Sequence, residues 1–185
     1  MLKRNSKDQM LVQRPESNDI TVLDEQDFVK GRSTGRSEPG PINEDYHHYR
    51  HSLDDRYTLW RNGPRDLDIY DCELLRVDET VPNFWTYNGA GCEPIAAVSN
   101  REVSKILGLS QLKDSTQIFH YYAKDQNNKI NVTTYKVKDF FPTSRSFLLV
   151  LDITTMEVSG NGEFVYLAGR EVFPGQPVMY FNQRM

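Results

Sequence analysis

Residues 146–181 constrain the fold more than any other part of the sequence. Two runs of apolar, β-branched and aromatic residues, one ending at Val158 and one beginning at Glu163, flank the tetrapeptide Ser159-Gly160-Asn161-Gly162. Such runs favour β-strands, and a glycine- and asparagine-rich tetrapeptide between them is typical of a hairpin turn. The sequence therefore predicts an antiparallel hairpin in this region.

Further strands are predicted upstream and downstream of this hairpin. Residues 116–123 and 130–137 are rich in Ile, Val, Thr and Tyr, and the turn-forming residues 125–129 separate them. Residues 67–77 alternate imperfectly between apolar and polar side chains, and residues 178–181 would form a last short strand. Strands that follow one another through hairpins predict a mostly antiparallel meander.

One helix is expected, over residues 93–109. Pro94 suits the first turn of a helix, and Gly108 suits the residue that ends one. Apolar side chains between them recur with a partly helical spacing: Ile95, Val98, Val103, Ile106 and Leu107. The predicted fold class is thus α+β, a mostly antiparallel sheet packed with one helical segment and preceded by a disordered N-terminal arm.

Residues 1–53 are predicted to be that flexible arm and linker, and residues 54–185 the β-rich globular domain. The first part holds few large apolar residues, and such a composition buries too little surface to offset chain entropy. An apolar island at residues 20–29 interrupts it. This island would form a short strand at the domain edge, or a linear motif that becomes ordered on a partner.

A second candidate for binding is the aromatic segment at residues 81–91. Its large side chains would either cover the core or form an exposed patch, and exposed aromatic patches usually mark an interface. The candidate binding residues from the arm and this segment are Ile20, Val22, Leu23, Phe28, Phe84, Trp85 and Tyr87.

Signatures of catalysis are absent from the sequence. It contains neither a phosphate-binding glycine loop nor a Gly-x-Ser-x-Gly elbow. His120 would serve Cys72 or Cys92 as a base only if folding brought them together. Asp68 and Asp71 would face opposite sides of a strand, so the acidic residues of this region are interpreted as a solvated strand face. We therefore expect no enzymatic activity, no cofactor and no metal site.

Residues 99–110 resemble the first helix and turn of helix-turn-helix DNA-binding proteins. Ser104 and Gly108 match the small residue and the turn glycine of that motif. A second, recognition helix should follow directly, but residues 116–122 favour a strand, and the net charge of -4 disfavours contact with phosphates. A nucleic-acid-binding regulatory protein is therefore an alternative, and specific DNA binding is not expected.

The sequence also bears on location. No run of about 18 apolar residues is present, and no apolar segment follows the basic N-terminal residues. With 2 cysteines and no secretory signal, an intracellular, cytoplasmic protein with reduced thiols is expected.

In layout and size the chain resembles the matrix proteins of rhabdovirus-like negative-strand RNA viruses. The shared layout is a polar arm, a strand, a helical segment, an antiparallel meander and no catalytic motif. This resemblance implies a compact α+β domain that self-associates beneath a membrane, with a place in the virion and contacts to a membrane surface or nucleocapsid. The predicted function is a non-enzymatic structural or assembly protein that forms homo-oligomers and docks protein partners through its arm. A further alternative is an enzyme whose site forms only in the fold.

Overall fold

The chain forms two compact units, Met1–Asn83 and Phe84–Met185. The computed structural model describes residues 2–4, 7–13, 19–24, 36–39, 48–51, 56–140, 151–171 and 179–184. The predicted division into an arm that ends at residue 53 and a domain that begins at residue 54 stays a prediction.

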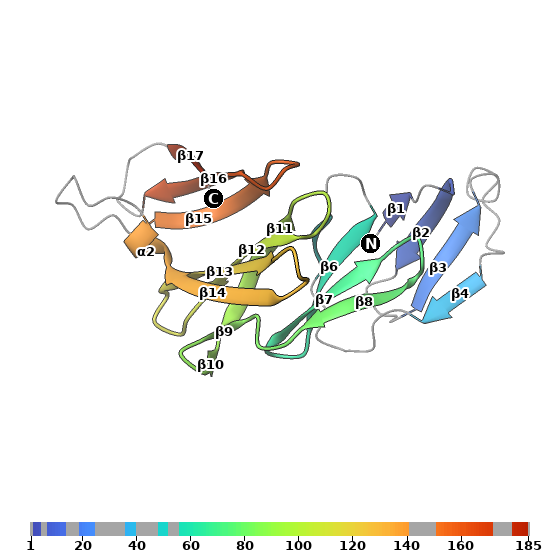
Figure 1. Cartoon of the computed structure of the whole chain (residues 1–185), viewed down its shortest axis with the longest axis horizontal. Helices are drawn as coiled ribbons and strands as arrows, with labels where there is room; N and C mark the ends of the chain where they lie inside the picture. The colour runs from blue at the N-terminus through green and yellow to red at the C-terminus, as the bar shows by residue number, and fades with distance from the viewer. Residues whose placement is uncertain are drawn as a thin grey trace. The chain divides into compact units, whose positions relative to one another are not determined.

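The first unit contains two four-stranded antiparallel sheets, sheet 1 and sheet 2, in which the strands lie side by side in chain order (Figure 1). Sheet 1 consists of β1 (Leu2–Arg4), β2 (Gln9–Gln13), β3 (Asp19–Asp24) and β4 (Arg36–Pro39). Sheet 2 consists of β5 (His48–His51), β6 (Tyr57–Asn62), β7 (Asp66–Asp71) and β8 (Arg76–Val81).

The second unit repeats this arrangement after a small hairpin. Sheet 3 has four antiparallel strands in chain order, and sheet 4 has three described strands. The hairpin is β9 (Thr86–Tyr87) and β10 (Ala90–Gly91). Sheet 3 consists of β11 (Glu93–Ser99), β12 (Lys105–Gln111), β13 (Gln117–Lys124) and β14 (Ile130–Lys136). The short α2 (Val137–Phe140) follows, and sheet 4 consists of β15 (Leu151–Val158), β16 (Phe164–Glu171) and β17 (Met179–Arg184).

The core of the first unit joins its two sheets. Apolar side chains of β2 and β3 form one buried cluster with side chains of β6 and β7 and with Cys72, which follows β7. Because neighbouring side chains of a strand point to opposite faces, alternate residues of β3 enter this cluster. Its members are Leu11, Ile20, Val22, Trp60, Tyr70 and Cys72.

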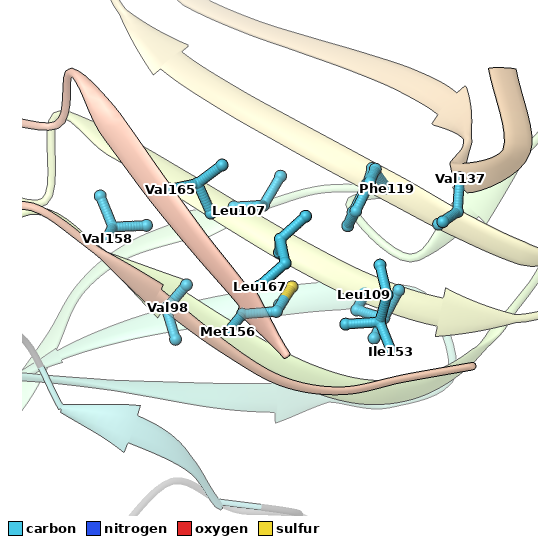
Figure 2. Packing of buried hydrophobic residues seen from close by; sticks show 10 residues of the cluster. All are labelled: Val98, Leu107, Leu109, Phe119, Val137, Ile153, Met156, Val158, Val165 and Leu167. Carbon is cyan, nitrogen blue, oxygen red and sulfur yellow. The ribbon is translucent and has the colours of Figure 1, made fainter. Parts of the chain in front are cut away.

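The core of the second unit joins sheets 3 and 4 in the same way. Figure 2 shows side chains from both sheets meeting in one layer, together with Val137 from the start of α2. Its members are Val98, Leu107, Leu109, Phe119, Val137, Ile153, Met156, Val158, Val165 and Leu167. Face-to-face packing of successive sheets is therefore the common principle of both units.

Strand β12 is buried on both of its faces. Leu107 and Leu109 point into the cluster between sheets 3 and 4, whereas Ile106, Gly108 and Ser110 point to the opposite face and are also buried. A strand buried on both faces is a continuous apolar run without alternation. Such a run has no period that distinguishes it from a buried helix.

The predicted helix over residues 93–109 is wrong, because these residues form the β11–β12 hairpin. The Asn100 side chain closes the turn: its Oδ1 accepts the Lys105 amide at 2.9 Å and its Nδ2 donates to Ser104 Oγ at 2.9 Å. Pro94 lies in β11, which is an outer strand of sheet 3 with an irregularity between Pro94 and Ala96. An outer strand tolerates the missing amide hydrogen of proline.

The α+β fold class is wrong for the same reason. Within the described residues α2 is the one helix, it has 4 residues, and nearly all other regular structure is β-strand. The disordered N-terminal arm is wrong as well, since strands β1 to β5 lie within residues 1–53. The antiparallel meander is confirmed, as are the hairpin with its turn at residues 159–162 and the strands at β13 and β14.

Gly108 is expected to be indispensable for the packing of sheet 3. An added Cβ would lie 2.7 Å from Phe84 Cε1 and 2.8 Å from Trp85 Cζ3, distances that packed carbon atoms do not reach. Gly108→Ala should therefore lower the free energy of unfolding by about 1–3 kcal/mol, which urea denaturation would measure. Combining it with Phe84→Leu should recover part of that loss, because the shorter side chain removes one of the clashes. Strict additivity of the two substitutions would contradict this packing.

Candidate interaction surface

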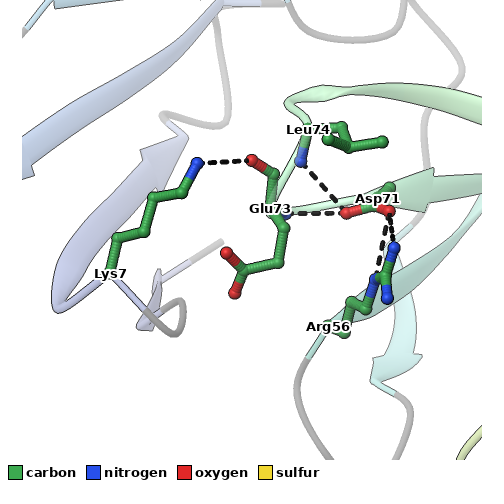
Figure 3. Close-up of polar contacts among 5 residues, drawn as sticks. All are labelled: Lys7, Arg56, Asp71, Glu73 and Leu74. Carbon is green, nitrogen blue, oxygen red and sulfur yellow. Dashed lines mark hydrogen bonds and ion pairs between the residues drawn. The ribbon is translucent and has the colours of Figure 1, made fainter.

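The turn between β7 and β8 is held by one buried carboxylate. Asp71, the last residue of β7, accepts hydrogen bonds at Oδ1 from the backbone amides of Glu73 at 2.8 Å and Leu74 at 3.1 Å (Figure 3). A short side-chain acceptor that binds amides two and three residues later is a common way to fix a turn. The backbone of this turn is therefore pinned to the end of the strand.

Arg56 binds the other oxygen of the same carboxylate. Its Nε and Nη2 donate to Asp71 Oδ2 at 3.1 and 2.9 Å. The Asp71 side chain is 1% exposed and the Arg56 side chain 47%, so the pair lies at the border of the core. The hydrogen bond from Arg56 to Asp71 raises the pKa of the guanidinium further above its ordinary value, and the Asp71 charge adds to this effect. Each Asp71 oxygen thus accepts two hydrogen bonds.

An apolar surface lies at the pinned turn and the start of β8; we call it the tip surface, and it consists of Leu74 in the turn and Val77 in the strand. Leu74 is 51% exposed and Val77 37%. The neighbouring Leu75 has a φ of +55° and packs against the core cluster of the first unit. Lys7, which lies between β1 and β2, donates to the Glu73 carbonyl oxygen at 3.3 Å (Figure 3). One leucine of the pair therefore points inward while the other remains in solvent.

A second buried carboxylate lies in the middle of β7. Asp68 accepts hydrogen bonds from Asn62 Nδ2 at 3.1 Å and from Thr80 Oγ1 at 2.6 Å, so it connects β7 with both neighbouring strands. Asp68 and Asp71 are both buried, and the prediction of a solvated strand face is wrong for them. A buried carboxylate is tolerated when hydrogen bonds replace its water.

A polar group lies inside the second unit, on the face of sheet 3 turned away from sheet 4. His120 Nε2 and Ser110 Oγ lie 2.6 Å apart, and the His120 ring packs edge-on against Trp85, with centroids 5.4 Å apart. The Cys92 thiol donates a long hydrogen bond to the Ala90 carbonyl oxygen at 3.9 Å and lies near enough to Ser110 for that hydroxyl to lower the thiol pKa. The fold therefore brings His120 and Cys92 to one serine, whereas Cys72 contacts Thr58 in the other unit at 3.4 Å.

The state of these groups does not suit nucleophilic catalysis. Burial lowers the pKa of His120 to about 4, and a contact with the Phe84 backbone acts in the opposite direction to a smaller extent. Burial likewise raises the pKa of the Cys92 thiol, although Ser110 lowers it in part. His120 Nδ1 makes no well-formed hydrogen bond to the described residues. The cluster is closed to solvent, and its geometry is that of a core contact.

The structure places the candidate binding residues in different environments. Ile20 and Val22 are buried between sheets 1 and 2, Phe84 and Trp85 are buried in the second unit, and Leu23 and Tyr87 are half-buried. Phe28 lies outside the described residues. Their role in binding stays a prediction. The helix-turn-helix prediction for residues 99–110 is wrong, because this segment is the end of β11, a turn and β12.

The tip surface was not found from the sequence. A strand had been predicted through residues 67–77, whereas residues 72–75 form a turn. The available signal was the segment Asp71-Cys72-Glu73-Leu74-Leu75. An aspartate can bind the backbone amides that follow it and so favours a turn, and two adjacent leucines cannot both face the same core.

Comparison with protein-family models gives no match, and neither does a search of curated proteins. Solved structures do match. One is from the yeast heterotrimeric Nup82-Nup159-Nup116 nucleoporin complex, with a TM-score of 0.56, 13% identity and coverage of 97% of this chain and 41% of that one. Another is the C-terminal WD40 domain of Sif2, with a TM-score of 0.54, 9% identity and coverage of 97% and 44%. A third is the dihydro-heme d1 dehydrogenase NirN, with a TM-score of 0.53, 12% identity and coverage of 98% and 36%.

These likenesses show the fold. Sheets 1, 2 and 3 are four-stranded antiparallel meanders, the kind of sheet that forms a β-propeller blade, and sheet 4 has three such strands within the described residues. The chain spans less than half the length of each of the three solved structures. The resemblance to viral matrix proteins is wrong, because the matching structures are propeller domains and the α+β layout behind it does not exist. Within the described residues, no helix has the length and apolar character needed to cross a membrane.

Removing the Asp71 carboxylate should destabilise the protein. Asp71→Ala leaves two turn amides and the Arg56 guanidinium without their acceptor, which predicts a loss of about 2–3 kcal/mol in the free energy of unfolding. Asp78→Ala, which removes the same charge from an exposed position of β8, should change it by less than about 0.5 kcal/mol. Equal effects of the two substitutions in chemical denaturation would contradict the role of Asp71.

Stability should also fall as the pH falls from 6.5 to about 4. Above pH 6.5 His120 is neutral in both states, whereas between these values the unfolded chain binds a proton that the folded chain excludes. The difference in pKa corresponds to about 3 kcal/mol, and this group should cause no further loss below pH 4. Urea unfolding across this range would measure the pH dependence of the free energy of unfolding in the natural protein and in His120→Gln. The variant lacks the imidazole, so its curve shows the part of the dependence that comes from the carboxylates. Parallel curves would show that His120 does not cause the dependence.

Proposed function

We propose that this chain is a non-enzymatic protein-interaction scaffold that binds a protein partner through the tip surface. The observation that carries the proposal is the exposure of Leu74, on a turn that Asp71 and Arg56 hold in place, and of Val77 in the strand that follows it. An exposed leucine gains free energy when a partner covers it. A turn that is already ordered loses little conformational entropy on binding, which favours affinity.

The surroundings of the tip surface fit a protein interface. Arg76 and Asp78 of β8 are exposed beside it, so charged side chains of both signs border the apolar residues. A small apolar centre with a polar rim is the usual composition of such an interface. The Glu73 carbonyl and its Lys7 contact add a second, polar side to the same turn.

The fold is compatible with this function but does not decide it. One structural neighbour belongs to a nucleoporin complex and another is a dehydrogenase, and at these identities the likeness concerns the fold alone. The choice rests on the chain's own residues. The His120 cluster is closed and neutral, and within the described part of the chain no three potential metal-binding side chains gather.

The proposal is tested by placing a photo-crosslinking amino acid at position 74 of the full chain in cells, with position 113 as an exposed control. A protein captured at 74 and not at 113 would be purified, and its affinity for the chain measured by calorimetry. Leu74→Asp should weaken binding about 10- to 100-fold, because a charge replaces a buried leucine at the interface.

Tyr166→Asp is the matched control, since it also replaces an exposed large apolar side chain, on another sheet. It should leave the affinity unchanged. The proposal is wrong if Leu74→Asp, with an unaltered thermal transition, binds every captured protein as tightly as the natural chain does.

A further inference from the structure

Strand β14 is an outer strand of sheet 3, and among the described strands it is hydrogen-bonded to β13 alone. It keeps one continuous register with β13 over its 7 residues. Half of the backbone N–H and C=O groups of an outer strand point away from the sheet. A regular outer strand therefore offers a row of donors and acceptors to another strand.

Other outer strands of this chain carry features that oppose such pairing. β11 contains Pro94, which lacks an amide hydrogen, and an irregularity follows it. β8 exposes Arg76 and Asp78, and its register with β7 shifts. β15 carries Glu157 and has an irregularity next to Ile153. Charges, proline and irregular register are the usual means by which a sheet edge avoids association.

β14 has none of these features. Its sequence, Ile-Asn-Val-Thr-Thr-Tyr-Lys, is mostly β-branched and aromatic, and Lys136 at its end is its one charged residue. Ile130 is 37% exposed and Tyr135 42%, so apolar area extends along the strand. A regular, nearly uncharged strand with exposed apolar side chains favours pairing with a further strand.

We propose that β14 pairs antiparallel with β14 of a second copy of this chain, so that sheet 3 continues across a two-fold axis. This symmetric arrangement uses the same patch on both copies. The axis passes through Thr133, the central residue of the strand, and all 7 residues of each copy take part.

The sequence of β14 is complementary to itself in this register. Thr133 lies opposite Thr133 of the partner, a pairing that antiparallel strands favour. On the other face of the ribbon Val132 lies opposite Thr134, and Ile130 lies opposite the aliphatic stem of Lys136. The two Lys136 charges are about 20 Å apart, well beyond the screening length at physiological salt. No two like charges face each other across the paired strands. This self-complementarity is the argument that the strand which pairs with β14 comes from a second copy of the chain.

Two strands of this length bury less area than a standard stable interface, so the dimer is weak and depends on concentration. The β14 edge belongs to the second unit, whereas the tip surface belongs to the first unit and consists of different residues. Self-association and the binding of a different partner can therefore fail separately.

Sedimentation of the full chain from about 1 μM to 1 mM should show a reversible monomer–dimer equilibrium. Thr133→Lys places two like charges about 5 Å apart at the axis and should abolish the dimer. Thr155→Lys introduces the same charge at an exposed threonine of β15 and should leave the equilibrium unchanged. A strict monomer throughout, or an equal loss in both variants, would overturn the proposal.

Two further measurements establish the register. Thr133→Glu alone should also be monomeric, but a mixture with Thr133→Lys should form a heterodimer, because opposite charges then meet at the axis. Thr133→Cys should form a disulfide-linked dimer under mild oxidation, since Cβ atoms at such a pair are within disulfide reach and both natural cysteines are buried. Thr155→Cys is its control. A mixture that stays monomeric, or equal crosslinking at both positions, would exclude this register.

Discussion

The burial of a sheet on both of its faces is the constraint on which the rest of this structure depends. In sheet 3, Leu107 and Leu109 need a neighbouring sheet on one side, while Ile106 and Gly108 need cover on the other. An isolated sheet of this composition would expose an apolar face, so each sheet is stable only when its neighbours are present. This is why consecutive meanders pack face to face in both units, and why a glycine is required where Phe84 and Trp85 approach the strand.

Such a core leaves few places for polar side chains, and those inside it connect strands. Asp68 binds residues of β6 and β8, and Asp71 joins Arg56 to the turn after β7. His120 and Ser110 connect β13 with β12. An apolar contact is not directional. A buried hydrogen bond is, because any other strand register would leave the polar groups without partners and raise the free energy of the folded state. These groups therefore fix the alignment of strands that apolar packing alone would leave free to slip.

Local strand signals were sufficient where one face of a strand is polar. The alternation of Ile130, Val132 and Thr134 and the glycine turn before Glu163 identified β14 and the β15–β16 hairpin. They failed at residues 105–111, whose double burial removes the period of two, and Gly108 was interpreted as the residue that ends a helix. The spacing of the sheets was a further signal: sheets 1, 2 and 3 begin at residues 2, 48 and 93. A period of about 45 residues is typical of propeller blades, but the Gly-His and Trp-Asp dipeptides that mark WD40 repeats are missing from the sequence.

The same double burial determines where this chain can bind anything. A face that packs on another sheet has no exposed side chains to offer, so the available surfaces are the turns at the strand ends and the outer edges of the sheets. Turns need an internal anchor to hold an exposed leucine in one position, and Asp71 supplies it for Leu74. Edges need regular backbone without charge, and β14 supplies it. The predicted binding residues Ile20, Val22, Phe84 and Trp85 are apolar, but their side chains are buried inside the two units. In a fold of stacked sheets, an apolar residue marks a binding surface when local geometry prevents its burial, and Leu74 next to the inward-facing Leu75 meets that condition.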